Sequence, residues 1–423
     1  MSSSELIEQS SKYLCNTYNR YPVVFSRGKG CKLWDVEGKE YLDFVAGLAV
    51  VNLGHCHPNV VNAIKEQAER LIHVSNYYHN EPMIELARLL CENSFAEKVF
   101  FCNSGAEANE AAIKLARKYA KENLGPGKFE IITMLKSFHG RTMATITATG
   151  QERFHKGFEP LLEGFKYVPY NDLEAVKNAI SEKTCAVMIE PIQGEGGVNV
   201  PSREYIQGLR KLCDERGILL IFDEVQTGIG RTGKLFAYEH FGPEPDIITL
   251  AKGLANGVPI GAMLTKDRFA GAFVPGAHAS TFGGNPLAAA AAIAVLQTFN
   301  REGAAKKEIK EVCPSCISTV RNIQKEDILR NCNIVGGYLI NRLKELKIGF
   351  DFIKDLRGMG LLIGMELSFD AGDIVKKCME RGILINYTNG NVLRFIPPLI
   401  VTEDEVDILI NTLSDIFMGI RKS

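Results

Sequence analysis

Residues 218–233 read ILLIFDEVQTGIGRTG, and the start of this stretch decides the fold class. Its five leading apolar residues show no polar alternation, which is typical of a strand buried on both faces of a parallel sheet. Similar runs lie at 98–102, 130–134, 185–189, 247–250 and 261–264, with amphipathic helical patterns at 106–121 and 202–216. This alternation predicts an α/β fold with a mostly parallel central sheet and right-handed crossovers.

The two ends of the chain differ from this middle part. Residues 1–50 contain short strands joined at glycines. Residues 335–423 read as helix, strand, helix, strand and helix, with Gly358 and Gly360 between the first helix and the first strand. The expected parts are an N-terminal segment at 1–54, a large domain at 55–300 and a C-terminal segment at 301–423, the two end segments forming one smaller α+β domain.

Composition and charge exclude several classes of protein. The 423 residues carry 49 Lys and Arg against 50 Asp and Glu, a balance that gives no field to attract nucleic acid. Eleven scattered cysteines indicate a reducing compartment. The N-terminus resembles no leader, and the longest apolar run, 287–296, is shorter than the roughly 20 residues of a membrane span. We expect a soluble cytoplasmic protein.

Three motifs suggest binding sites that their surroundings disfavour. GIGRTG at 228–233 matches GxGxxG, but no long helix follows, which favours a tight loop over a nucleotide site. HCHP at 55–58 places adjacent side chains that rarely reach one metal, and its proline signals a helix start. CPSC at 313–316 lies in a lysine-rich, insertion-like segment, 300–327, without a second pair for a four-ligand zinc site. No metal site is predicted.

Polar residues with chemical potential follow three of the expected strands. Ser104 and Glu107 form an S-x-x-E capping box around Gly105, and such a helix start binds phosphate. Asp223 ends one apolar strand and Lys252 follows another. Each alone has a structural alternative, namely an ordinary cap, a capping aspartate or a surface lysine. Together, at neighbouring strand ends, they are the parts that pyridoxal phosphate needs.

Longer motifs carry a family resemblance over nearly the whole chain outside 300–327. They are FCNSGAEANEAAIKLAR (101–117), SFHGRT (137–142), EPIQGEGGV (190–198), FDEVQTGIGRTG (222–233), LAKGLANGVPIGA (250–262) and HASTFGGNPLA (278–288). The chain resembles the class III pyridoxal-phosphate aminotransferases of fold type I, and among them those that act on acetylornithine.

The resemblance implies a cofactor site. Lys252 would hold pyridoxal phosphate covalently and then shuttle the proton, while Asp223 would pair with the ring nitrogen. Phe138 would stack on the ring. The other implied cofactor-binding residues are Gly105 and Ala106 at the phosphate, Glu224, Val225 and Gln226, with Gln226 near the ring hydroxyl, and Thr281, which would reach the phosphate of a neighbouring subunit. The last of these implies a homodimer with shared active sites.

The resemblance also implies a substrate site. Arg141 would bind the α-carboxylate, Ser280 would line the pocket and Tyr18 would lie near the substrate amine. Glu195 and Arg394 would form a switch in which a dicarboxylate replaces Glu195 on the arginine, because arginine–carboxylate pairs are strong and specific in geometry. The alternative for Arg394 is a structural ion pair.

The expected activity is transfer of the terminal amino group of N2-acetylornithine to 2-oxoglutarate, as a step of arginine biosynthesis. An apolar Leu48, where ornithine aminotransferases carry tyrosine, suits an acylated substrate better than an unpaired ammonium. The alternatives are ornithine, succinylornithine, succinyl-diaminopimelate or 4-aminobutyrate as the amine donor, an aminomutase or decarboxylase, and a silent binding protein of the same fold.

Overall fold

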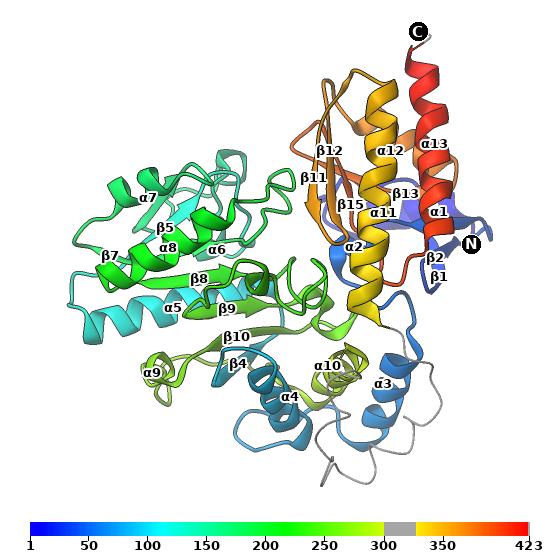
Figure 1. Ribbon diagram of the computed structural model, residues 1–423. Helices are drawn as coiled ribbons and strands as arrows, with labels where there is room; N and C mark the ends of the chain where they lie inside the picture. The colour runs from blue at the N-terminus through cyan, green and yellow to red at the C-terminus, as the bar shows by residue number, and fades with distance from the viewer. Residues whose placement is uncertain (300–326, 422–423) are drawn as a thin grey trace.

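The computed structural model of the protein describes residues 1–299 and 327–421. Its centre is a seven-stranded sheet in the order β4-β10-β9-β8-β7-β5-β6 (Figure 1). The strands are β4 (Lys98–Cys102), β5 (Glu130–Met134), β6 (Phe165–Val168), β7 (Thr184–Ile189), β8 (Leu219–Asp223), β9 (Ile247–Leu250) and β10 (Gly261–Thr265). β10 runs in the opposite direction to the other six strands, which all point the same way. The predicted α/β fold with a mostly parallel sheet is confirmed.

Helices cover both faces of this sheet, as the unbroken apolar runs predict. Along β8, Leu219 and Ile221 pack in one cluster with α5, whereas Leu220 and Phe222 pack in another with α8. The helices of this part are α3 (Pro58–Arg70), α4 (Glu81–Glu92), α5 (Gly105–Asn123), α6 (Met143–Ala148), α7 (Leu173–Ala179), α8 (Arg203–Arg216), α9 (Asp267–Ala270) and α10 (Pro286–Phe299), with the 3-10 turns η1 (Glu152–Phe154), η2 (Ala237–His240) and η3 (Lys252–Ala255). The edge strand β6 was not predicted, because three of its four residues are only half-buried and it lacks an apolar run.

Elements from both ends of the chain lie side by side on the other side of the molecule (Figure 1). β1 (Phe25–Lys29), β2 (Lys32–Asp35) and β3 (Glu40–Asp43) form a sheet with β13 (Ile383–Leu384), and a second sheet has the order β11 (Ile353–Met359), β12 (Leu362–Leu367), β15 (Val392–Phe395), β14 (Asn386–Thr388). The helices here are α1 (Ser3–Tyr13), α2 (Ala46–Ala49), α11 (Ile328–Gly349), α12 (Gly372–Glu380) and α13 (Glu403–Arg421). The domain boundaries remain a prediction.

The C-terminal order of elements differs from the prediction. Gly358 and Gly360 lie after the start of the first strand, at the hairpin between β11 and β12, where both have positive φ. The prediction was wrong because β11 carries charged residues along an exposed half and shows no apolar run. The CPSC motif at 313–316 lies outside the described residues.

Two classes of feature are absent from the described part of the chain. Within residues 1–299 and 327–421, no helix combines the length and the apolar run that a membrane span requires. In the same residues, no three His, Cys, Asp or Glu side chains are grouped to hold a metal ion.

Candidate active site

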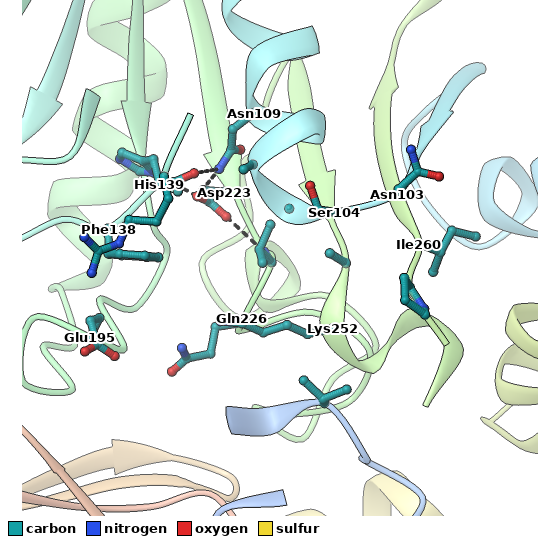
Figure 2. Close-up of a pocket in the computed structure, with 18 of the residues that line it drawn as sticks. Asn103, Ser104, Asn109, Phe138, His139, Glu195, Asp223, Gln226, Lys252 and Ile260 are labelled. Atoms are coloured by element: carbon teal, nitrogen blue, oxygen red, sulfur yellow. Dashed lines mark hydrogen bonds and ion pairs between the residues drawn. The ribbon is translucent and has the colours of Figure 1, made fainter. Parts of the chain in front are cut away.

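A cavity of about 430 Å³ opens beyond the carboxyl ends of the parallel strands (Figure 2). Its wall is formed by residues that follow β4, β5, β7, β8 and β9 in the chain. The predicted site residues that line it are Gly105, Ala106, Phe138, Arg141, Glu195, Asp223, Val225, Gln226 and Lys252. The structure therefore brings together nine residues that lie up to about 150 positions apart in the sequence.

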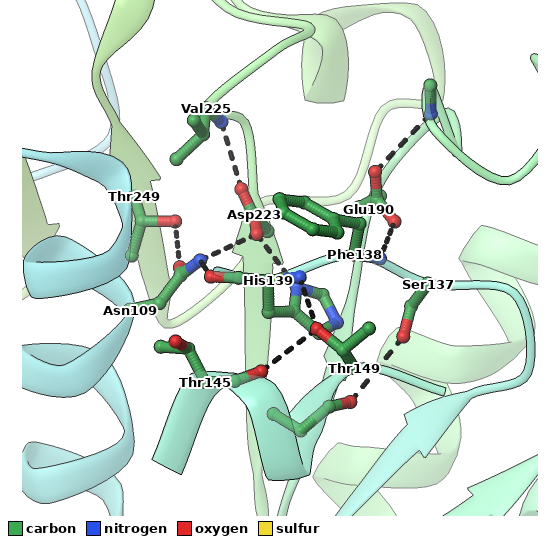
Figure 3. Close-up of polar contacts among 12 residues, drawn as sticks. Asn109, Ser137, Phe138, His139, Thr145, Thr149, Glu190, Asp223, Val225 and Thr249 are labelled. Carbon is green, nitrogen blue, oxygen red and sulfur yellow. Dashed lines mark hydrogen bonds and ion pairs between the residues drawn. The ribbon is translucent and has the colours of Figure 1, made fainter. Parts of the chain in front are cut away.

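Asp223 lies at the base of this cavity and is held by three donors (Figure 3). Its Oδ2 accepts hydrogen bonds from Asn109 Nδ2 and His139 Nδ1, each at 2.7 Å, and its Oδ1 accepts from the Val225 backbone N–H at 3.0 Å. The residue is 3% exposed. The carboxylate is fixed in orientation, and Oδ1 keeps a free lone pair for one further donor.

Asn109 and His139 were not predicted. Asn109 also donates to the His139 carbonyl at 2.7 Å and accepts from Thr249 Oγ1 at 2.6 Å, and the His139 N–H donates to Thr149 Oγ1 at 2.9 Å. The network thus joins four segments around one acid. The sequence did carry a signal for Asn109, which is an amide among the alanines of one face of α5. The structure buries this face and Asn109 with it, so the amide needs hydrogen-bond partners.

The N-terminus of α5 forms one wall of the cavity. Ser104 accepts from the Glu107 N–H at 3.2 Å, but Glu107 reaches back to the Asn103 N–H at 2.5 Å and not to that of Ser104. The predicted capping box is therefore only half formed. The first N–H groups of a helix have no acceptor within it, so those of Gly105 and Ala106 are available to an anion.

Gly105 is required by packing at this helix start. A Cβ there would lie 2.6 Å from Val225 Cγ1. Val225 lies two residues after Asp223, and its backbone N–H donates to Asp223 Oδ1, so the helix start packs against the loop that holds the acid. This close approach places the anion-binding N–H groups and the carboxylate in one cavity.

Lys252 follows β9 and begins η3 with a positive φ of 42°, an uncommon conformation for a side chain with a Cβ. Burial lowers the pKa of Lys252, and the Arg394 charge lowers it further, while Asp223 and Glu195 act in the opposite direction. A lowered pKa increases the population of the neutral amine, which is the nucleophilic form.

Glu190 is a second cavity residue that was not predicted. It is 5% exposed, and its two carboxylate oxygens accept from the Phe138 N–H at 2.9 Å and the Gly194 N–H at 3.3 Å. Burial raises the pKa of Glu190 to about 7, with the Asp223 charge adding to the rise. It directly follows the apolar strand β7, the same position relative to a strand that drew attention to Asp223.

The structure also brings the two predicted switch residues together. Glu195 Oε2 and Arg394 Nη1 are 3.0 Å apart. Arg394 lies on β15, is 2% exposed, and also donates to Asn386 Oδ1 at 3.2 Å and Gln226 Oε1 at 3.4 Å. Glu195 lines the cavity and Arg394 lies behind it, so a ligand that displaced Glu195 would meet the guanidinium.

Arg141 extends along two aromatic rings at the exposed side of the cavity. Its guanidinium carbon lies 4.1 Å from the centroid of the Phe154 ring and 5.6 Å from that of Phe138. Phe154 in turn packs edge-on against Phe138 at 5.7 Å. Stacking on aromatic rings orients a guanidinium while its N–H groups stay available for a carboxylate.

Besides Arg394, four predicted site residues do not line the cavity. The Glu224 carboxylate points to η2, where it accepts from the Ala237 and Tyr238 N–H groups at 2.6 and 2.8 Å. Ser280 lies at the edge, where its Oγ accepts from Asn103 Nδ2 at 3.3 Å. Thr281 borders a separate small hollow, and Tyr18 is exposed against Arg20.

Leu48 belongs to a left-handed turn near the cavity. Every residue of α2, Ala46–Ala49, has positive φ, a conformation that costs roughly 1–2 kcal/mol for each residue with a Cβ. Asp43 holds the turn by accepting from the N–H groups at its start, and His55 binds Asp43 at 2.7 Å. The turn leaves Leu48 47% exposed, while its two alanines are buried.

The residues around the cavity fit the predicted cofactor. A phosphate would find the free N–H groups of Gly105 and Ala106, and a protonated ring nitrogen would find the free lone pair of Asp223 Oδ1. Lys252 supplies an amine of lowered pKa within the same cavity. An aldehyde-bearing, phosphorylated pyridine matches this set of groups.

Comparison with known proteins gives consistent results over the full length. The profile of the family Aminotransferase class-III matches residues 13–314 and 311–417. Acetylornithine aminotransferase of Caldanaerobacter subterraneus subsp. tengcongensis is 54% identical over 417 residues, covering 98% of this chain and 100% of that protein. Acetylornithine aminotransferase of Methanocaldococcus jannaschii is 51% identical over 422 residues, covering 100% of both. Among solved structures, ornithine aminotransferase of Toxoplasma gondii superposes with a TM-score of 0.91 at 35% identity, covering 100% of this chain and 96% of that one.

Proposed function

The chain belongs to the class III aminotransferases, and from this we propose that it transfers the terminal amino group of N2-acetylornithine to 2-oxoglutarate. The products are N-acetylglutamate 5-semialdehyde and glutamate. The enzyme is a pyridoxal-phosphate-dependent transaminase, and the resemblance drawn from its motifs is confirmed. The 3.0 Å pair of Glu195 and Arg394 beside Lys252 supports a site that must accept two substrates in turn.

Pyridoxal phosphate, when bound, supplies an aldehyde that condenses with amines and a ring that withdraws electrons from the reacting carbon. Gly105 and Ala106 would hold its phosphate through backbone N–H groups, and Phe138 would lie on its ring. Asp223 would hold a proton on the ring nitrogen. Asn109 and His139 keep the Asp223 carboxylate turned toward that position.

Lys252 carries the proton transfer in this proposal. Its lowered pKa leaves part of the amine neutral, so that Nζ could take a proton from the substrate carbon and deliver it to the cofactor. The positive φ of Lys252 is unfavourable for a residue with a Cβ. It therefore indicates that the surrounding loop holds Lys252 in position.

Two arginines would bind the substrate carboxylates. Arg141, aligned on Phe138 and Phe154, would hold the α-carboxylate of both substrates. With the amine donor, Glu195 would remain on Arg394. With 2-oxoglutarate, the distal carboxylate would take the place of Glu195 on Arg394 and so keep the buried guanidinium paired.

A homodimer is part of the proposal. Thr281 and Tyr18 lie outside the cavity of their own chain, so the roles that the resemblance gives them would be carried out at the site of a second copy. Large apolar side chains around Thr281 are exposed, including Tyr77 at 94%, Phe282 and Ile72. Such a cluster is typical of a surface that another subunit covers.

A reducing cytoplasm suits the nine cysteines of the described residues, all of which are free.

The test is a single half-reaction. The visible absorbance of the purified holoenzyme is followed while one amine is added without any keto acid. N2-acetylornithine is compared with ornithine, 4-aminobutyrate and succinyl-diaminopimelate, and we expect it to bleach the cofactor fastest. A Lys252→Ala variant serves as the control, because it should bind the amine but lose turnover by about 10⁴-fold or more.

Ornithine is the second candidate, because the Toxoplasma ornithine aminotransferase shares the fold so closely. Fastest bleaching by ornithine would overturn the substrate assignment and keep the enzyme class. A holoenzyme that responds to no amine in the panel would contradict the proposed function itself.

A further inference from the structure

We propose that Glu190 is a positioning residue that sets Glu195 over Arg394 and thereby controls how readily a dicarboxylate displaces Glu195. The inference deepens the proposed function and rests on it. It concerns a buried acid that the mechanism above does not otherwise use.

Glu190 joins the two loops that carry the substrate-binding groups. Its Oε1 accepts from Phe138, in the loop that also carries Arg141, and its Oε2 accepts from Gly194, the residue before Glu195 (Figure 3). Glu190 is thus one of the side chains that fix the relative position of the two loops at the cavity.

The residues on either side of Glu195 also pack closely against Leu135 and Lys136, which precede Phe138 in the other loop. Gln193 Nε2 donates to the Leu135 carbonyl at 2.9 Å, and a Cβ at Gly196 would lie 2.3 Å from the Lys136 carbonyl oxygen. Thr388 Oγ1 donates to the Glu195 carbonyl. These contacts hold the backbone on both sides of Glu195, so displacement of its carboxylate requires a side-chain rotation.

The hydrogen bond to Gly194 holds the residue directly before Glu195. At 3.3 Å it is the longer of the two Glu190 contacts, so it is the one that a proton on the carboxyl disturbs first. An ionised carboxylate only accepts, whereas a protonated one places a donor against an N–H group. Loss of this contact removes the backbone hydrogen bond directly before Glu195 and so loosens the alignment of Glu195 on Arg394.

The charged and titratable groups around Glu190 place this change near neutral pH. Burial and Asp223 raise the pKa of Glu190 to about 7, and His139 and the two N–H donors oppose the rise. Tyr170 donates its hydroxyl to the Glu190 carbonyl, and Lys252 faces the same cavity. As pH rises through about 7, Glu190 ionises, both ties form and Glu195 masks Arg394 more firmly.

The test uses glutarate, a dicarboxylate that cannot be transaminated, and the intact holoenzyme. Its dissociation constant is measured by titration calorimetry between about pH 6 and about pH 8. For the wild type we expect glutarate binding to weaken about fivefold as pH rises, the size of one lost hydrogen bond. Glu190→Gln should bind glutarate tightly over the whole range, and its KM for the amine donor should rise more than its kcat falls.

Glu224→Gln is the matched control. Glu224 is equally buried, also accepts two backbone N–H groups, and burial raises its pKa to about 7, but it contacts η2 and lies outside the cavity. Its variant should lose thermal stability as Glu190→Gln does, yet keep the wild-type pH dependence of glutarate binding.

Three results would overturn the role of Glu190. They are equal glutarate binding by wild type and Glu190→Gln, the same change in Glu224→Gln, and wild-type binding that is flat or strengthens with rising pH. The last needs no variant, so a misfolded Glu190→Gln does not prevent a decision. Failure of the amine panel is a separate result and concerns the proposed function.

Discussion

Two arginines in the described part of the chain are almost completely buried, and they are bound in opposite ways. Arg231, in the loop after β8, is 0% exposed and donates to Leu361 O at 3.0 Å, Pro397 O at 2.5 Å and Asn52 Oδ1 at 2.7 Å. These three acceptors are uncharged. Arg394 is 2% exposed but has the Glu195 carboxylate at 3.0 Å.

The difference shows that a buried guanidinium can either hold parts of the fold together or bind a ligand. The acceptors of Arg231 come from the two ends of the chain, and two of them are backbone carbonyls, which cannot leave. Burial lowers the pKa of Arg231 to about 10, because desolvation disfavours the charged form of the guanidinium. The main partner of Arg394 is a partly exposed side chain that a ligand carboxylate can replace.

The largest expected effect follows from removing Arg231. An Arg231→Met variant keeps much of the volume but leaves three buried acceptors without a donor, so we expect a loss of about 3 kcal/mol or more in unfolding free energy. Thermal and urea unfolding measure it. The soluble fraction should retain the wild-type ratio of KM values for the two substrates, and unchanged stability would contradict the role of Arg231 as a structural tie.

Removing Arg394 should have the complementary effect. In Arg394→Met, the freed Glu195 carboxylate is partly exposed and can be hydrated, so unfolding should change little. The KM for 2-oxoglutarate should rise by about 100-fold, the size of a charge-assisted pair, while the half-reaction with the amine donor changes only a few-fold.

Arg394→Lys sharpens this result as a control. Lysine keeps the charge but not the planar fork, so only part of the 2-oxoglutarate affinity should return. If both half-reactions fell equally in Arg394→Met, the arginine would be a structural ion pair after all, as its sequence also allowed.

The two arginines also mark what the sequence could and could not predict. β4 and β5 match the predicted ranges 98–102 and 130–134, because strands buried on both faces leave an unbroken apolar run. β6 and β11 leave no such run, since solvent reaches one side of each. The GIGRTG segment was correctly interpreted as a loop, but nothing within it indicates that Arg231 is enclosed by residues more than 100 positions away.

The active site shows the same limit. Asp223 and Lys252 were identified because a polar residue after an apolar strand is conspicuous, whereas Asn109 and His139 act on Asp223 from other elements. Glu190 has the same position after a strand as Asp223 and was still overlooked, because its partners are backbone N–H groups, which leave no pattern in a sequence.

The smallest expected effect tests the comparison most directly. Glu195→Gln replaces the anion on Arg394 with a neutral amide, which gives Arg394 the kind of surroundings that Arg231 has. Stability should change little, and 2-oxoglutarate should bind about threefold more tightly, because it no longer competes with a resident carboxylate. The KM for the amine donor should rise by a similar factor in steady-state measurements.

Combining this change with Glu190→Gln then separates two explanations. If Glu190 acts through Glu195, the double variant should match Glu195→Gln alone, since the carboxylate whose position Glu190 controls is no longer present. Additive effects on 2-oxoglutarate affinity would mean that Glu190 acts on the substrate by a different route, such as its contact with Phe138. If Glu195→Gln brings no gain in 2-oxoglutarate affinity, then Arg394, like Arg231, is held mainly by uncharged neighbours. For Arg394 these are Asn386 and Gln226.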